Sequence, residues 1–175
     1  MIDQNSTVES SRIFQAVPDD TAVLIGLAND TGIFQPGEVE ALFGSVLDDI
    51  HAGRQAAGHQ AHVCLEGSSG SILGWVYFGP SANADGVWDL WWIGVTPTRQ
   101  CEGVGSHLLR FVEDRVRSSA GRLLVVETSS LPTFESVRHF YRKHQFTECG
   151  TIPDFYAAGD GKVIFAKQIA MEKSY

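Results

Sequence analysis

A pair of glycines between two regular segments constrains this chain most strongly. Residues Trp88–Val95 form an apolar segment typical of a strand, and Ser106–Val116 has the amphipathic spacing of a helix. Between them runs Arg-Gln-Cys-Glu-Gly-Val-Gly-Ser, residues 99–106. A strand that turns through glycines into a helix start forms a nest of backbone N–H groups at the positive end of the helix dipole. The sequence therefore predicts a phosphate site, here for the pyrophosphate of a nucleotide cofactor.

Two other phosphate-binding loops are excluded by the residues that follow the glycines. A P-loop requires Lys and then Ser or Thr after its last glycine, whereas Ser-His follows Gly105. A dinucleotide-binding loop requires Gly or Ala three residues after its second glycine, and Leu108 stands there. The pattern that remains is Gln/Arg-x-x-Gly-x-Gly/Ala, which Gln100, Gly103 and Gly105 match.

With this pattern the chain resembles the GCN5-related N-acetyltransferase (GNAT) superfamily, in which this loop holds the pyrophosphate of acetyl-CoA. A second motif supports the resemblance, because residues 140–146 match the family's Phe-Tyr-x-x-x-Gly-Phe signature except at Gln145. The resemblance covers residues 87–169 closely and the N-terminal half only in its general layout. At 175 residues the chain fits a single acetyltransferase domain, with residues 1–11 as a flexible tail.

The predicted fold is mixed α/β, with a GNAT-like, mostly antiparallel twisted sheet of six to seven strands flanked by about four helices. The expected strands are Arg12–Val17, Ala61–Glu66, Ser71–Phe78, Gly86–Val95, Leu123–Thr128, Phe146–Ile152 and Val163–Ile169. The expected helices are Thr21–Asn29, one from Gln35–Glu38 to Ile50, Ser106–Val116 and Thr133–His144.

The composition of the chain limits its possible partners, its location and its metal binding. A net charge of -8 argues against nucleic acid and fits a cationic amine substrate, although acidic surfaces also serve solubility alone. No apolar stretch is long enough for a membrane span, and the polar start is not a signal peptide. The three cysteines lack Cys-x-x-Cys spacing, which predicts reduced thiols in a cytoplasmic protein. The six histidines show no metal-binding spacing, so no metal is expected.

The resemblance implies acetyl-CoA as the co-substrate. Backbone groups of Ile93 and Val95 would bind its pantetheine arm, which would run beside the strand like an added strand. The pyrophosphate would lie among the residues of the loop: Arg99, Gln100, Gly103, Val104, Gly105 and Ser106.

Acetyl transfer from a thioester to an amine needs a neutral amine, a polarised carbonyl and a proton for the leaving thiolate. Tyr141 matches the family tyrosine that serves the departing sulfur, and its alternative role is core packing. Asp89 is the first candidate for the base, because it stands in an apolar run where an unpaired charge is costly to bury. Histone-acetylating members of the superfamily carry their glutamate base at this place. The alternative is a structural Asp89, with Glu127 as the base or as a contact to the substrate cation.

The resemblance also places the acceptor amine. In the family, the N-terminal helices flank the acceptor pocket and the last strand-to-strand loop borders it. This implies that Phe34, Asp154 and Tyr156 contact the substrate, with Phe43 as a further candidate. Ordinary packing is the alternative for each aromatic residue among them.

The sequence therefore predicts an N-acetyltransferase that transfers an acetyl group directly from acetyl-CoA to a primary amine of a small molecule or peptide. Cys101, Phe134 and Gln145 depart from the family pattern, and with Gln145 in place of glycine the preceding helix is expected to end differently. These departures leave open a non-catalytic CoA-binding regulatory module. Because the loop would contact only the pyrophosphate, it does not specify the acyl group, so another acyl-CoA donor also stays open. A homodimer stays open as well, since dimers are common in the family.

Overall fold

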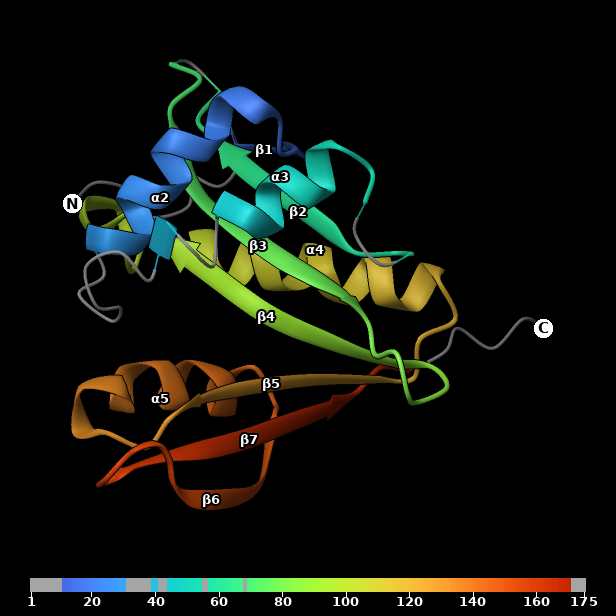
Figure 1. The fold of residues 1–175 in the computed structure, drawn as a ribbon, viewed down its shortest axis with the longest axis vertical. Coiled ribbons are helices and arrows are strands. Elements are labelled where there is room, and N and C mark those ends of the chain that lie inside the picture. The colour runs from blue at the N-terminus through green and yellow to red at the C-terminus, as the bar shows by residue number, and fades with distance from the viewer. Residues whose placement is uncertain (1–10, 31–38, 41–43, 55–56, 68, 171–175) are drawn as a thin grey trace. The chain divides into compact units, whose positions relative to one another are not determined.

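The computed structural model describes residues 11–30, 39–40, 44–54, 57–67 and 69–170 (Figure 1). Its elements are β1 (Arg12–Gln15), η1 (Pro18–Asp20), α2 (Thr21–Asp30), α3 (Ser45–His51), β2 (Gln60–Leu65), β3 (Ile72–Pro80), β4 (Val87–Val95), η3 (Pro97–Arg99), α4 (Val104–Ser118), β5 (Leu123–Ser129), η4 (Pro132–Phe134), α5 (Glu135–Lys143), β6 (Thr147–Ala157) and β7 (Asp160–Gln168). The seven strands form one sheet in the order β1-β2-β3-β4-β5-β7-β6. The predicted mixed α/β fold, with a mostly antiparallel sheet and four α-helices among the described residues, is confirmed.

The chain forms two compact units. The first comprises residues 1–79 and 92–112, and the second comprises residues 80–91 and 113–175. Strand β4 and helix α4 each contribute residues to both units. A single domain over residues 1–175 stays a prediction.

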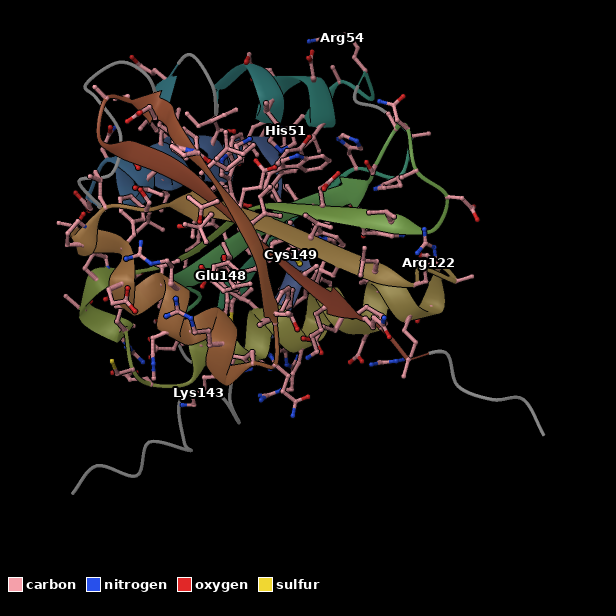
Figure 2. All side chains as sticks on the ribbon, turned by 90° about the horizontal axis from the view of Figure 1, so that it is seen from below. His51, Arg54, Arg122, Lys143, Glu148 and Cys149 are labelled. Carbon is pink, nitrogen blue, oxygen red and sulfur yellow. The ribbon has the colours of Figure 1, made fainter. Side chains whose placement is uncertain are left out.

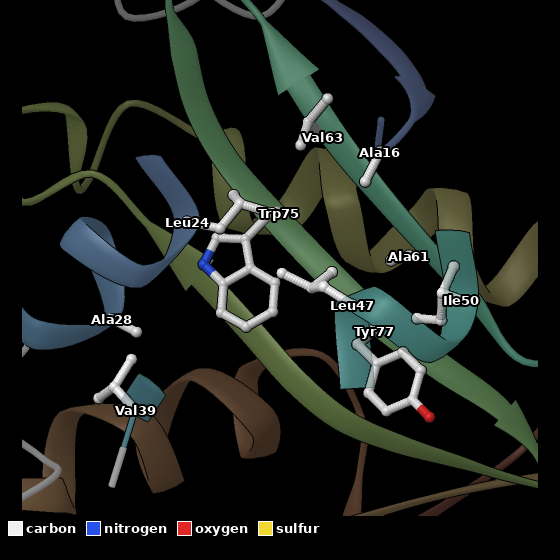
Figure 3. Packing of buried hydrophobic residues seen from close by; sticks show 10 residues of the cluster. All are labelled: Ala16, Leu24, Ala28, Val39, Leu47, Ile50, Ala61, Val63, Trp75 and Tyr77. Atoms are coloured by element: carbon white, nitrogen blue, oxygen red, sulfur yellow. The ribbon is translucent and has the colours of Figure 1, made fainter. Parts of the chain in front are cut away.

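The core of the first unit lies between the strands β2 and β3 and the helices α2 and α3 (Figure 3). Helix α2 follows the 3-10 turn η1, where Pro18 stands at the first position and Asp20 accepts a hydrogen bond from the backbone N–H of Val17 at 2.9 Å. The buried residues of this core include Leu24, Ala28, Leu47, Ile50, Ala61, Val63, Trp75 and Tyr77. The core residues Ala61 and Val63 of β2, and Trp75 and Tyr77 of β3, are each two residues apart, as the two-residue period of a strand requires. The predicted start of the second helix at Gln35–Glu38 lies outside the described residues.

The second unit is organised around β5, which pairs in parallel with β4 and antiparallel with β7. Helix α5 covers one face of this sheet, because the ring of Tyr141 lies 5.7 Å from the ring of Phe165. The buried guanidinium of Arg138 donates hydrogen bonds to the carbonyl oxygens of Ser129 (2.6 Å) and Leu131 (3.0 Å). These bonds fix the connection from β5 to α5.

The turn between β3 and β4 is held by the residue that precedes β5. Arg122 donates a hydrogen bond from its backbone N–H to the carbonyl of Gly86 at 2.7 Å and from Nε to the carbonyl of Asp85 at 3.0 Å. Figure 2 shows Arg122 beside this turn. The start of β4 is thereby tied to the start of β5, its parallel neighbour.

Two predictions about the C-terminal part are wrong. Helix α5 was expected to end differently because Gln145 replaces glycine, yet Gln145 adopts the left-handed conformation (φ 67°) that glycine favours at this place. The N–H of Phe146 closes the helix on the carbonyl of Tyr141 at 3.1 Å. In addition, β6 continues to Ala157, so Asp154 and Tyr156 belong to a strand and not to a loop.

Candidate active site

The predicted phosphate loop lies between β4 and α4, as expected. Cys101 (φ 65°) and Gly103 (φ 88°) both have left-handed backbone conformations, and α4 begins one residue later. Helix geometry leaves the first N–H groups of α4 without carbonyl partners inside the helix. Because α4 has 15 residues, the loop leads into the positive end of a long helix dipole. This arrangement can bind an anion through backbone groups.

Packing holds the start of α4 in place. Val104 and Leu108 are buried almost completely, and Leu109 and Val112 continue the buried stripe along the helix. A Cβ atom at Gly74 would lie 2.6 Å from the carbonyl oxygen of Gly94 and 3.0 Å from Leu108. The glycine in β3 is thus required for the close approach of β4 and α4 within the first unit.

The side chain of Arg99 is bound by two carboxylates. Its Nη2 lies 2.8 Å from Oε1 of Glu66, and its Nε lies 2.9 Å from Oε2 of Glu102. The hydroxyl of Ser69 donates to Glu66 at 2.7 Å. Hydrogen bonds from Ser69 and then from Arg99 lower the pKa of Glu66 below its ordinary value. Arg99, predicted to surround a pyrophosphate, therefore ties the loop to the β2–β3 turn.

The other predicted cofactor residues lie where the strand and loop place them. Ile93 and Val95 are half-buried in the last part of β4, and Gln100 is exposed after η3. Gly105 and Ser106 lie in the first turn of α4. The structure thus brings all of the predicted loop residues together in the first unit.

An aromatic cluster in the first unit was missed by sequence reasoning. The ring of Trp92 lies 5.0 Å from Tyr77 and 5.9 Å from Trp75. The Tyr77 hydroxyl forms a hydrogen bond of 2.7 Å with Nδ1 of His59. Burial, and to a smaller extent Asp49, raises the pKa of Tyr77. The alternation of Trp75 and Tyr77 in the sequence was the available signal, since both face one side of β3.

Tyr141 lies in the second unit, on α5, and is 3% exposed. Its ring lies 5.5 Å from the rings of Phe140 and Phe146. This desolvation raises the pKa of Tyr141 well above its ordinary value. The hydroxyl keeps its proton at neutral pH and can donate a hydrogen bond, while its raised pKa makes it a weaker acid than an exposed phenol.

The two candidate bases occupy different strands of the second unit. Asp89 is half-buried on β4 and pairs in register with Val125 of β5. Glu127 is exposed on β5, and its Oε2 lies 2.5 Å from Nζ of Lys162 on β7. The carboxylate of Glu127 is thus already bound by an ammonium group.

The predicted substrate-binding residues also differ in their surroundings. Asp154 has a left-handed backbone (φ 52°), and its carboxylate accepts a hydrogen bond from the N–H of Gly159 at 2.7 Å. Tyr156 is half-exposed, and its ring contacts that of Phe155 at 5.1 Å. Phe34 and Phe43 lie outside the described residues.

The described part of the chain contains no metal-binding cluster and no helix suited to span a membrane. No group of three or more His, Cys, Asp or Glu side chains there could hold a metal ion. None of the helices described has the length and apolar character that a membrane span needs.

The chain is similar to known acetyltransferases in sequence and in structure. A family model described as an acetyltransferase (GNAT) domain matches residues 57–148. A solved structure from Desulfovibrio desulfuricans, described as an acetyltransferase of the GNAT family, is 32% identical, and the match covers 91% of this chain and 99% of that one with a TM-score of 0.81. A search of curated proteins found no match.

Two more distant structures share the fold. The ribosomal-protein-S18-alanine N-acetyltransferase of Escherichia coli is 16% identical, with a TM-score of 0.73 over 94% of this chain and 99% of that one. A protein from Salmonella typhimurium, described as an acetyltransferase with its cofactor acetyl-CoA, is 16% identical, with a TM-score of 0.68 over 94% of this chain and 97% of that one. At this identity the likeness shows the fold alone.

Proposed function

The chain belongs to the GNAT family of acetyltransferases, and we propose that it transfers the acetyl group of acetyl-CoA directly to a primary amine of a small molecule or peptide. The observation that carries the proposal is the loop before α4, with left-handed backbone at Cys101 and Gly103. Acetyl-CoA in the Salmonella typhimurium structure supports this co-substrate.

The loop fits the pyrophosphate of acetyl-CoA. The backbone N–H groups from Gly103 to Ser106 would bind it, because they stand at the start of a 15-residue helix. Ile93 and Val95 would offer backbone groups to the pantetheine arm. Arg99 would keep the loop in shape through Glu66 and Glu102.

Acetyl-CoA supplies an activated thioester, so a covalent enzyme intermediate is unnecessary. Tyr141 would donate a proton or hydrogen bond to the departing sulfur, because a phenol carries its proton at neutral pH. Asp89 would take the proton of the substrate ammonium group. Glu127, whose carboxylate forms an ion pair with Lys162, is the alternative base.

The acceptor amine would bind beside Glu127 and the half-exposed ring of Tyr156. Phe34 and Asp154 stay candidates for further acceptor contacts. The reaction would take place in the cytoplasm, where the free thiols of Cys64, Cys101 and Cys149 would remain reduced.

Titration calorimetry with acetyl-CoA, CoA and adenosine tests the cofactor, and thiol release across a panel of primary amines tests the reaction. We expect micromolar binding of acetyl-CoA and CoA, no binding of adenosine, and amine-dependent release of CoA. Binding without thiol release would instead support a regulatory module, and release from propionyl- or succinyl-CoA alone would support another acyl donor.

A pair of glycine variants separates loop function from stability. Gly103 (φ 88°) and Gly53 (φ 66°) are both left-handed, so Gly103→Ala and Gly53→Ala introduce the same type of backbone strain. Only Gly103→Ala is expected to weaken acetyl-CoA binding. Equal affinities in the two variants would show that the loop is an ordinary turn.

A further inference from the structure

The ammonium group of Lys162 is enclosed by groups of its own chain. Its Nζ lies 2.5 Å from Oε2 of Glu127, 3.7 Å from the centroid of the Phe155 ring and 5.9 Å from that of Tyr156. The Lys162 side chain is only 14% exposed. A carboxylate together with aromatic faces is the set of groups by which proteins bind alkylammonium ions. Lys162 thus occupies an ammonium site.

The sheet register explains how these groups meet. Glu127 of β5 is opposite Ile164 of β7, and Lys162 comes two residues before Ile164, so the side chains of Glu127 and Lys162 lie on the same face as diagonal neighbours. Phe165 lies out of phase with Lys162 and contacts Tyr141 of α5. The ammonium site is therefore on the face of this sheet opposite to α5.

A bulge in β6 supplies the aromatic side. Between the pairs Ile152–Lys162 and Ala157–Asp160, five steps along β6 match two steps along β7. The three extra residues of β6 bend the strand, and the bond from the Gly159 N–H to Asp154 fixes the bend. The bulge places the rings of Phe155 and Tyr156 against each other, with Lys162 over Phe155.

We propose that Glu127, Phe155 and Tyr156 form an ammonium-binding cage that Lys162 fills from within the chain. By filling it, Lys162 excludes acceptors that would place a second ammonium group there. The preferred acceptor is then a monoamine whose remaining part is neutral or anionic, and a diamine is a poor substrate. The statement about acceptors rests on the proposed function, whereas the statement about the cage does not.

The cage is tested without any acetyl transfer by chemical rescue. Lys162→Ala removes three methylene groups and the ammonium group, which n-propylammonium replaces. We expect propylammonium to raise the Tm of Lys162→Ala saturably by about 2 °C or more, with no such rise in the unchanged protein or with propanol. The double variant Glu127→Gln/Lys162→Ala should lose the rescue.

Lys167→Ala is the matched control. Lys167 is also on β7, is 18% exposed and pairs with Glu113 at 2.6 Å, but its Nζ lies 5.7 Å from the centroid of the Phe146 ring, much farther than Lys162 from Phe155. Propylammonium is not expected to rescue this variant to the same extent. Equal rescue of the two variants, or none of Lys162→Ala, would overturn the cage. Should Lys162→Ala not fold, it is replaced by Lys162→Met, for which loss of thermal stability relative to Lys167→Met is the readout.

Acceptor choice is tested by the ratio of kcat/KM for 1,4-diaminobutane to that for butylamine. Lys162→Ala should raise this ratio by about tenfold, since it empties the cage and frees the Glu127 carboxylate, and Lys167→Ala should leave it unchanged. An unchanged ratio in Lys162→Ala would overturn the exclusion of diamines. If no amine is acetylated, the proposed function fails while chemical rescue still decides the cage.

Discussion

The guanidinium of Arg99, at the end of η3, lies 2.8 Å from the carboxylate of Glu66, which follows β2. The same guanidinium is bound by Glu102 at 2.9 Å, inside the loop that precedes α4. Arg99 thereby joins the phosphate loop to the β2–β3 turn. Because two carboxylates share its charge, we expect Arg99 to act on the cofactor by holding the loop in shape.

Replacing Glu66 by glutamine should weaken acetyl-CoA binding modestly. Glu66→Gln keeps the shape of the side chain and removes the charge that holds Arg99. Since the pair is partly exposed, we expect the Kd for acetyl-CoA to rise by about two- to fivefold, with kcat unchanged. Asp114→Asn, which breaks the ion pair with Arg117 on α4, is the control. A fall in kcat with unchanged Kd would contradict this positioning role.

The same ion pair should be lost in acid. The pKa of Glu66 is lowered, first by Ser69 and then by Arg99. The stabilisation that the ionised Glu66 carboxylate provides is therefore fully present above the unfolded pKa of about 4.3, and it disappears as pH falls through the folded pKa. The difference in unfolding free energy between the unchanged protein and Glu66→Gln should be constant near neutral pH and shrink below about pH 4. Denaturant unfolding at a series of pH values measures it, and a difference that grows in acid would contradict the assignment.

Replacing Cys101 by glycine should stabilise the protein. Cys101 is exposed and has φ 65°, a conformation that costs a residue with a Cβ about 1–2 kcal/mol. Glycine also raises the conformational entropy of the unfolded chain, which offsets part of this gain. The free energy of unfolding of Cys101→Gly should therefore rise by about 0.5–1 kcal/mol, and its Tm by about 1–3 °C. Cys149→Gly, an exposed cysteine in β6, should instead lose stability. Thermal unfolding of both variants checks the prediction, which fails if Cys101→Gly is no more stable than Cys149→Gly.

Replacing Tyr141 by phenylalanine should abolish most of the turnover. Tyr141→Phe keeps the ring contacts and removes only the hydroxyl, so kcat should fall by about 10²–10⁴ while the Kd for acetyl-CoA is kept. Phe140→Leu is the control, because it disturbs the packing around Tyr141, 5.5 Å away, and leaves the hydroxyl. Steady-state kinetics with the best amine of the panel gives both values. Unchanged kcat in Tyr141→Phe would restrict Tyr141 to core packing.

Local sequence signals predicted most of the regular elements. The two-residue period of Trp75 and Tyr77, and the helical stripe of Leu108 and Val112, reflect burial that each element requires wherever it packs. The end of α5 was predicted wrongly, because neighbouring bonds of the folded chain hold Gln145 in a conformation that its residue type disfavours.

The sequence by itself determined the mixed α/β fold, the glycine loop before α4 and the position of Tyr141 on its helix, because each depends on residues close together in the chain. Only the tertiary structure decided that Arg99 binds Glu66 and that Lys162 binds Glu127. The physical reason is that both pairs join segments far apart in the chain: the register of β5 with β7 brings Glu127 to Lys162, and the β2–β3 turn meets the loop before α4 at Arg99. No local pattern encodes the partner of a side chain on another strand or turn.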